Sequence, residues 1–219
     1  MRTAGQALAL ALAVDELPGL LLRGVQGYEG HCMALDDRAS REAAARQANE
    51  ALIETADALA GAGHQCSIVS GGGTGTYSVT GANPRIDEVQ AGSYVLMDCF
   101  HERLVAGEFE LALTVCGSVI SRQGSTVVLD CGRKSVSTDF GRPHLVGRPE
   151  ADVRMVAEEH CLVDFGGPPS LELGDTVEVA LSYAPTGVNL HDVFHVVEGG
   201  VVTDVWPVSP RGSGPPAFL

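Results

Sequence analysis

A glycine-rich segment, Ser70-Gly71-Gly72-Gly73-Thr74-Gly75-Thr76-Tyr77, directly follows a short apolar run and is the strongest candidate for chemistry in this sequence. Three consecutive glycines let backbone N–H groups approach an anion without interference from Cβ atoms, and Ser70, Thr74 and Thr76 add hydroxyl donors. The segment is neither a Walker A loop, which needs Gly-Lys-Ser/Thr, nor a GxGxxG fingerprint. Spacing alone therefore leaves two alternatives open, a phosphate-binding loop and a flexible glycine-rich turn.

A second segment, Gly24 to His31 with the sequence GVQGYEGH, places an aromatic ring, a carboxylate and an imidazole close together. It follows another apolar run, so it is expected at the end of a neighbouring parallel strand. Because the carboxyl ends of parallel strands meet at the same edge of a sheet, both motifs are predicted to open on one rim. The alternative for Tyr28 and His31 is ordinary loop packing.

The elements that position these motifs alternate between helices and short strands. A helix is predicted over residues 5–15, a buried strand over Leu20–Val25, and a second buried strand over Cys66–Val69. Between the two strands, Asp36 or Asp37 is expected to cap a helix that runs to about residue 60 and ends at Gly61 and Gly63. Its apolar positions fall on one face: Leu52, Ile53, Ala56, Leu59 and Ala60. This pattern predicts a right-handed parallel crossover.

The second half of the chain changes character at about residue 108. Alternating, β-branched runs predict an antiparallel β-domain with strands over Phe109–Ile120, Thr126–Leu129, Thr176–Leu181, Val193–Val197 and Val201–Trp206. The last two runs flank Glu198-Gly199-Gly200, which is a hairpin signal. The tail from Pro210 to Pro216 is rich in Pro, Gly and Ser and is expected to be loose.

Composition narrows the class of protein. The 219 residues carry a net charge of −14, which argues against nucleic-acid binding because phosphates need Lys and Arg. The six cysteines include no C-x-x-C pair, and we interpret them as reduced core residues of a cytoplasmic protein. The apolar run Ala7–Val14 fits a helix better than a signal peptide, and no stretch is long enough to cross a membrane.

Seven segments, in this order, carry a specific resemblance: LRGVQGYEGH, VSGGGTGTY, EVQAGSYVLMD, VVLDCGRKSVSTDFG, EEH, GVNLHD and VVTDVWPVSPRG. They resemble the C-terminal portion of the D-threonine aldolases and the related D-serine dehydratases, from about residue 5 to Arg211. The resemblance implies an alanine-racemase-like fold of class α/β + β, with a partial (β/α)8 barrel over residues 1–107 and an antiparallel β-domain over residues 108–219.

The resemblance also implies pyridoxal 5′-phosphate as cofactor. Ser70, Gly71, Gly72, Gly73 and Thr74 match the family's cradle for the cofactor phosphate, and Tyr28 and Tyr94 match tyrosines beside the cofactor. The implied substrates are D-3-hydroxy amino acids, cleaved to glycine and an aldehyde or dehydrated to a 2-oxo acid, and the implied full-length form is a homodimer in which the neighbouring β-domain completes each site. A racemase or deaminase of the same fold is an alternative.

The sequence departs from the family pattern at the residues that react. Its one lysine, Lys134, lies in a motif that does not supply the family's Schiff-base lysine, and the resemblance begins in the middle of the barrel. We therefore expect a truncated, inactive chain, with a degenerate homologue or a gene-prediction artefact as alternatives. The family's metal ligands align with Tyr183 and Pro185, so no divalent metal is expected. His31 is the nearest imidazole to Tyr28 and the candidate for proton transfer.

Overall fold

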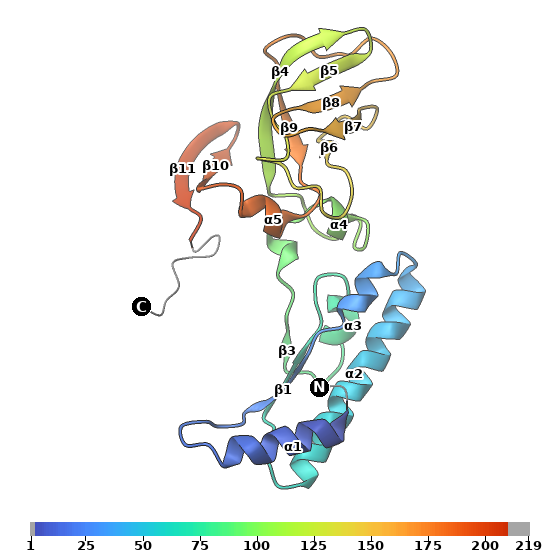
Figure 1. The fold of residues 1–219 in the computed structure, drawn as a ribbon. Coiled ribbons are helices and arrows are strands. Elements are labelled where there is room, and N and C mark those ends of the chain that lie inside the picture. Colours follow the sequence, from blue (N-terminus) through green and yellow to red (C-terminus); the bar gives the residue numbers. More distant parts are fainter. Residues whose placement is uncertain (1–2, 210–219) are drawn as a thin grey trace. The chain divides into compact units, whose positions relative to one another are not determined.

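The computed structural model describes residues 3–209, and its contacts divide the chain into two units, 1–94 and 95–219 (Figure 1). The division falls before the boundary after residue 107 that the sequence pattern indicates. The tail from Pro210 to Pro216 and the last residues of the seventh motif lie outside the described residues, as does Met1. Within residues 3–209, no helix is both long and apolar enough to cross a membrane.

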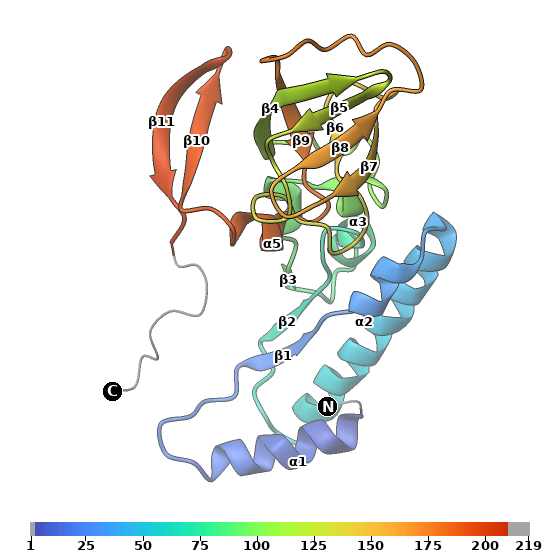
Figure 2. The ribbon, with the colours of Figure 1, turned by 45° about the horizontal axis from the view of Figure 1, so that its top comes forward.

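The first unit is a three-stranded parallel sheet with helices. Its sheet has the order β1-β2-β3 and its elements are α1 (Ala4–Asp15), β1 (Gly24–Gly27), η1 (Gly30–Ala34), α2 (Arg38–Gly61), β2 (Ile68–Gly71), α3 (Tyr77–Gly81), β3 (Glu88–Val89) and η2 (Ser93–Val95). Figure 2 shows α2 running beside β1 and β2, and α1 packs on α2. The predicted parallel crossover, β1–α2–β2, is confirmed.

The long helix forms where its caps predict it. The Asp37 side chain accepts a 2.8 Å hydrogen bond from the N–H of Ser40, which satisfies an otherwise unpaired donor of the first turn. The helix ends at Gly61, and Gly63 follows with φ +91°. Ala56 and Leu59 are buried as predicted, but Ala60 is exposed because it lies just outside the face that packs on the sheet.

Two strand predictions are shifted. The apolar run Leu20–Val25 was expected to be a strand, yet β1 begins at Gly24, and Leu20 and Leu21 are 56 % and 70 % exposed. The parallel ladder begins with Gly24 opposite Ile68, and Leu20, Leu21 and Leu22 have no ladder partner among the described residues. For the same reason β2 begins at Ile68 rather than at Cys66. Hydrophobicity indicated where the apolar segments lie, but hydrogen-bonded pairing with the neighbouring strand determines where each strand begins.

The second unit is built on a curled antiparallel sheet of six strands in the order β6-β9-β4-β5-β8-β7, with β10 and β11 forming a separate hairpin. Its elements are α4 (Cys99–Glu102), β4 (Thr114–Gln123), β5 (Thr126–Leu129), β6 (His144–Leu145), β7 (Asp152–Val156), β8 (Cys161–Asp164), β9 (Thr176–Ala180), α5 (Ala184–Val188), β10 (Val193–Glu198) and β11 (Val201–Pro207). The end strands β6 and β7 lie in contact, so the sheet is nearly closed.

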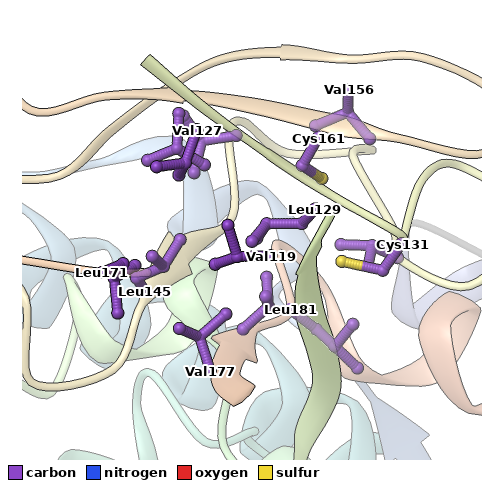
Figure 3. Close-up of a cluster of buried hydrophobic side chains, with 14 residues drawn as sticks. Val119, Val127, Leu129, Cys131, Leu145, Val156, Cys161, Leu171, Val177 and Leu181 are labelled. Carbon is purple, nitrogen blue, oxygen red and sulfur yellow. The ribbon is translucent and has the colours of Figure 1, made fainter. Parts of the chain in front are cut away.

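One large hydrophobic cluster fills this curled sheet (Figure 3). Val127, Leu129 and Val163, from the neighbouring strands β5 and β8, have no exposed surface. Burying each such side chain contributes about 1.5–3 kcal/mol. The predicted hairpin is also present: Glu198 pairs with Val201, and Gly199 and Gly200 both have positive φ, as a two-residue loop requires. The antiparallel β-domain is confirmed.

Candidate functional site

The glycine-rich loop follows β2 directly and packs against the loop that follows β1. Gly72 has φ +73°, and a Cβ added at Gly73 would lie 2.7 Å from Cε2 of Tyr28. A Cβ at Gly30 would lie 3.0 Å from Cε1 of the same ring. The Tyr28 ring thus lies against Gly73 and Gly30, and only residues without side chains allow this approach. The structure brings the two sequence motifs together on one rim.

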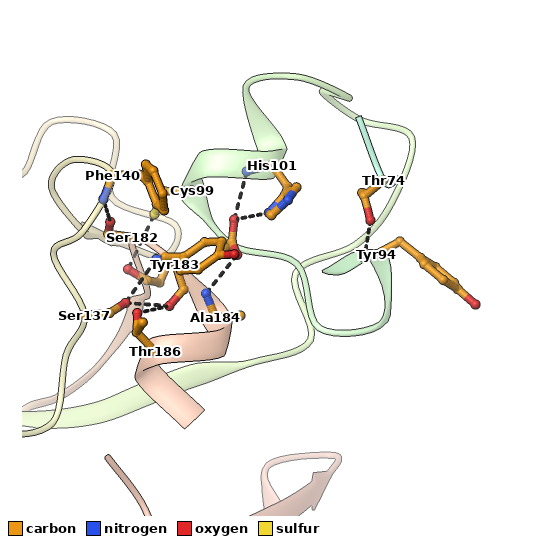
Figure 4. A network of polar contacts seen from close by, with 12 residues as sticks. Thr74, Tyr94, Cys99, His101, Ser137, Phe140, Ser182, Tyr183, Ala184 and Thr186 are labelled. Carbon is orange, nitrogen blue, oxygen red and sulfur yellow. Dashed lines mark hydrogen bonds and ion pairs between the residues drawn. The ribbon is translucent and has the colours of Figure 1, made fainter. Parts of the chain in front are cut away.

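The loop is also tied to the segment that precedes the second unit. Oγ1 of Thr74 accepts a 3.1 Å hydrogen bond from the N–H of Tyr94 (Figure 4). Thr74 is 4 % exposed, whereas Tyr94 is 43 % exposed. The predicted residues Thr74 and Tyr94 therefore lie side by side, with the tyrosine at the surface of the rim.

A chain of neutral polar side chains crosses the three strands beside the loop. Nε2 of Gln90 donates a 2.9 Å hydrogen bond to Oγ of Ser70, and Nε2 of Gln26 donates a 3.0 Å bond to Oε1 of Gln90. Gln26 and Ser70 are direct partners in the parallel ladder, so their side chains share a face of the sheet. Ser70 was predicted from its motif, but the two glutamines were not.

A buried carboxylate inside the rim was not predicted as a site residue. Glu29 is 3 % exposed; one oxygen accepts a 3.2 Å hydrogen bond from the N–H of Gly72 and the other accepts a bond from the hydroxyl of Thr76. The guanidinium of Arg41, on α2, is equally buried, and its Nε donates a 3.2 Å hydrogen bond to the carbonyl of Gly75. The loop is therefore held by side chains from two elements.

His31, the predicted proton-transfer residue, lies on η1 rather than on the loop. Its Nε2 lies 3.7 Å from the sulfur of Cys32. Burial, followed by the nearby Glu29 charge, raises the pKa of the Cys32 thiol. His31 and Tyr28 are among the residues that line a groove of about 520 Å³ between α1, β1 and α2. A catalytic role for His31 stays a prediction.

The single lysine lies in the second unit and is ion-paired. Nζ of Lys134 contacts a carboxylate oxygen of Glu159, and both side chains are more than half exposed. The hydrogen bond that Lys134 donates to Glu159 raises the pKa of Lys134, which favours the charged ammonium over the neutral amine. Lys134 therefore lies at the surface. The Glu158-Glu159-His160 segment is exposed as well.

The region of Tyr183 and Pro185 is organised by Asp98, which has no exposed surface. Oδ1 of Asp98 accepts 2.8 Å hydrogen bonds from the backbone N–H and from Nδ1 of His101, and Oδ2 accepts a 2.8 Å bond from the N–H of Ala184. One carboxylate thus joins the first turns of α4 and α5. Asp98 ends the third of the seven segments that carry the resemblance, but neither Asp98 nor His101 was predicted as a site residue.

The side chains at the two family metal positions do not fit a divalent cation. The Tyr183 ring packs edge-on against Phe140, with ring centroids 4.8 Å apart, and is stacked on His101 at 6.0 Å. Pro185 lies in the first turn of α5 and has no donor atom. His191 nearby is occupied: its Nε2 is 2.9 Å from the carbonyl oxygen of Ser135. Over residues 3–209, no group of three or more His, Cys, Asp or Glu side chains could hold a metal ion.

The cysteines are free thiols in varied settings. Cys32, Cys131 and Cys161 are buried, as the prediction of core residues requires, whereas Cys116 is exposed. Cys116 lies on β4, which pairs with β9 on one side, and its side chain points away from the hydrophobic cluster. The expectation that all six thiols lie in the core is therefore wrong for Cys116, because strand alternation places it on the outer face.

Comparison with known proteins gives consistent matches. Residues 112–197 match the family described as "Putative serine dehydratase domain". The chain is 34 % identical to a D-threonine aldolase of Arthrobacter sp. over 213 residues, and 34 % identical to a 3-hydroxy-D-aspartate aldolase of Paracoccus denitrificans (strain Pd 1222) over 215 residues. Each match covers 94 % of this chain but only 55 % of the relative, so the chain spans about half the length of these relatives.

Solved structures agree with the sequence matches. The D-threonine aldolase from Filomicrobium marinum superposes with a TM-score of 0.89 at 31 % identity, covering 93 % of this chain and 57 % of that one. An alanine-racemase-like protein from Idiomarina loihiensis has a TM-score of 0.74 at 20 % identity, covering 93 % and 59 %, and shows the shared fold. The chain therefore belongs to the family of the D-threonine aldolases and D-serine dehydratase-like proteins, with an alanine-racemase-like fold.

Proposed function

We propose that the chain binds the phosphate group of pyridoxal 5′-phosphate in its glycine-rich loop and represents part of a lyase for D-3-hydroxy amino acids. The names of its relatives support the substrate class, because they are aldolases of D-threonine and of 3-hydroxy-D-aspartate. In this proposal the Cα–Cβ bond of the substrate breaks to give glycine and an aldehyde. Loss of the β-hydroxyl to give a 2-oxo acid is the related outcome.

One observation carries the cofactor proposal: the glycine run and the Tyr28 ring meet on one rim, with no room between them for a Cβ at Gly73. Gly73 approaches the Tyr28 ring so closely that a side chain there would collide with it. The turn at Thr74 and Gly75 has successive backbone N–H groups, which can donate hydrogen bonds to the oxygens of a phosphate with up to two negative charges. The residues present fit the phosphate end of the cofactor.

The chain's own residues then have distinct tasks. The loop binds and orients the phosphate, while the half-exposed ring of Tyr28 borders the space beside it. Tyr94 is held at the rim through its N–H bond to Thr74. His31, which lines the same groove as Tyr28, is our candidate for moving a proton. When bound, pyridoxal phosphate supplies an electron sink conjugated to the substrate amine.

The test is a binding titration followed by fluorescence, with pyridoxamine 5′-phosphate as a ligand that needs no lysine. Gly73→Ala forces a Cβ against the Tyr28 ring, so we expect affinity to fall about tenfold or more, which is about 1.4 kcal/mol. Gly5→Ala is the matched control, because a Cβ there meets nothing within 4 Å. Equal affinity of the Gly73→Ala and Gly5→Ala variants would show that the glycine-rich loop does not bind the cofactor phosphate.

A second candidate, a catalytically inactive homologue, is favoured by Lys134. This lysine is paired with Glu159 and its pKa is raised, so it is poorly suited to carry the cofactor covalently. We expect borohydride treatment in the presence of pyridoxal phosphate to leave Lys134 unmodified in peptide mass analysis. A reduced adduct on Lys134 would contradict the proposal of an inactive homologue and would favour catalysis by this chain.

Two further properties belong to the proposal. Free thiols at all six cysteines support a cytoplasmic location, where thiols stay reduced. A homodimer with sites completed by the partner's β-domain is proposed for the full-length form, from the family resemblance. Light scattering of a full-length protein measures this assembly, and a monomer at all concentrations would exclude it.

A further inference from the structure

Glu29 is a costly residue in its position. A carboxylate that is 97 % buried loses most of its hydration, and this loss costs several kcal/mol unless both oxygens find donors. Here both oxygens are satisfied by the glycine-rich loop itself, through the N–H of Gly72 and the hydroxyl of Thr76. The residue is therefore matched to one conformation of that loop.

The same contacts decide which donors of the loop are already in use. The N–H of Gly72 donates to Glu29, and the N–H of Gly73 donates to Oγ1 of Thr76 at 3.1 Å. The Thr76 N–H closes the turn on the carbonyl of Gly73, also at 3.1 Å. The first half of the glycine run thus has its N–H groups turned inward.

The second half of the loop is arranged differently. Within residues 3–209, no acceptor is found for the N–H groups of Thr74 and Gly75. The Gly75 carbonyl is held by Arg41, whose Nη1 also donates 2.7 Å and 3.1 Å hydrogen bonds to the carbonyls of Leu35 and Asp36. Two successive N–H groups in a fixed turn make a concavity that suits an anion.

We propose that Glu29 is a positioning residue, which holds the first half of the loop and thereby directs the phosphate to the N–H groups of Thr74 and Gly75. This inference rests on the proposed function. The charge of Glu29 makes the inference more specific, because a negative charge beside the site repels a phosphate. The benefit of Glu29 must come from its hydrogen bonds, and a neutral residue of the same shape should serve as well or better.

The experiment uses the ¹⁵N-labelled full chain, titrated with inorganic phosphate and with pyridoxamine 5′-phosphate. In the unchanged chain we expect the largest amide shifts at Thr74 and Gly75. Glu29→Ala should lower the affinity about tenfold or more, whereas Glu29→Gln should keep it equal or raise it. Glu54→Ala, which removes an exposed carboxylate from α2, is the control for lost charge.

The conformation of the loop can also be measured without any ligand. Hydrogen exchange of the Gly72 amide should be slow in the unchanged chain and in Glu29→Gln, and fast in Glu29→Ala, while β5 and β8 amides keep their protection in all three. Unchanged Gly72 exchange in Glu29→Ala would overturn the inference, and so would phosphate shifts centred on Gly72 and Gly73.

The two proposals fail in different ways. If neither ligand binds the unchanged chain, the proposed function fails and the direction of the phosphate fails with it, while Gly72 exchange still tests whether Glu29 holds the loop. If both ligands bind but Glu29→Ala binds them as tightly as the unchanged chain, the proposed function stands and Glu29 is not a positioning residue.

Discussion

The two units bury different kinds of residues. The hydrophobic cluster beneath α1 in the first unit has three buried members, Ala7, Ala11 and Leu59, two of them alanines. The cluster inside the second unit has 14 members, most of them Val and Leu (Figure 3). Conversely, the described part of the first unit, residues 3–94, has seven buried polar or charged residues, most of them at the glycine-rich loop: Glu29, Arg41, Asn49, Ser70, Thr74, Thr76 and Thr80.

This contrast suggests that the second unit contributes most of the fold's stability, whereas the first unit contains the groups suited to binding a ligand. Large apolar side chains stabilise a fold in proportion to the area they bury, whereas buried polar groups bring specificity at a desolvation cost. The β-domain is therefore expected to be the more stable unit, and the α/β unit the one whose loop geometry depends on a few hydrogen bonds. Local stability differs across a structure in this way, and functional loops belong to its low end.

The largest expected effect is the loss of a core side chain in the β-domain. Leu129→Ala removes a side chain with no exposed surface and should lower the free energy of unfolding of that unit by about 2–5 kcal/mol. Leu173→Ala, at a position 66 % exposed, is the control and should change it little. Urea denaturation with hydrogen exchange measures both. Equal loss of protection in α2 and in β5 after Leu129→Ala would show that the units unfold as one.

A smaller loss of stability is expected from a change at Asp98, the buried carboxylate of the second unit. Asp98→Asn replaces an acceptor of three hydrogen bonds with a group that must point an N–H₂ at one of the donors, so we expect a loss of about 2–3 kcal/mol. Asp139→Asn is the control, since Asp139 is exposed and accepts from Thr186 alone. Equal urea midpoints for the two variants would deny Asp98 its organising role.

Sequence reasoning succeeded where local chemistry determines local structure. Asp37 was predicted as a cap because its side chain satisfies an N–H of its own helix, and Gly199-Gly200 as a turn because glycine accepts positive φ. The glycine-rich loop, Tyr28 and Tyr94 were placed together by resemblance, and the structure brings them together. The cap and the turn required no knowledge of distant contacts, whereas the meeting of the loop with the two tyrosines came from the resemblance alone.

The misses have a common physical cause, which is pairing between residues far apart in sequence. Glu29 and Asp98 were not predicted to be buried, because only the fold shows that Gly72 and Ala184 supply their donors. Strand β7 was not predicted, since its five residues include Asp152 and Arg154, and it exists through its ladder with β8. Strand β1 began later than its apolar run for the same reason.

A kinetic difference is expected between two thiols of the second unit. Burial raises the pKa of Cys99 to about 11, so at pH 9 only about one molecule in a hundred carries the thiolate. Iodoacetamide at pH 9 should therefore modify the exposed Cys116 first. Because the folded chain keeps the Cys99 proton where an unfolded chain loses it, this thiol's contribution to stability is complete below pH 9 and falls as the pH rises toward 11. Faster labelling at Cys99 would contradict its burial.

The smallest effect is expected at Lys134, which tests whether the comparison between the units extends to cofactor binding. Lys134→Gln breaks a solvent-exposed pair with Glu159, and exposed pairs contribute little because water and salt screen them. We expect an unchanged urea midpoint and unchanged affinity for pyridoxamine 5′-phosphate, since the phosphate loop and its supports all lie in the first unit. If Lys134→Gln weakened cofactor binding while Gly73→Ala did not, the cofactor would be held by the β-domain. The unit with the large hydrophobic core would then also be the unit that binds the cofactor.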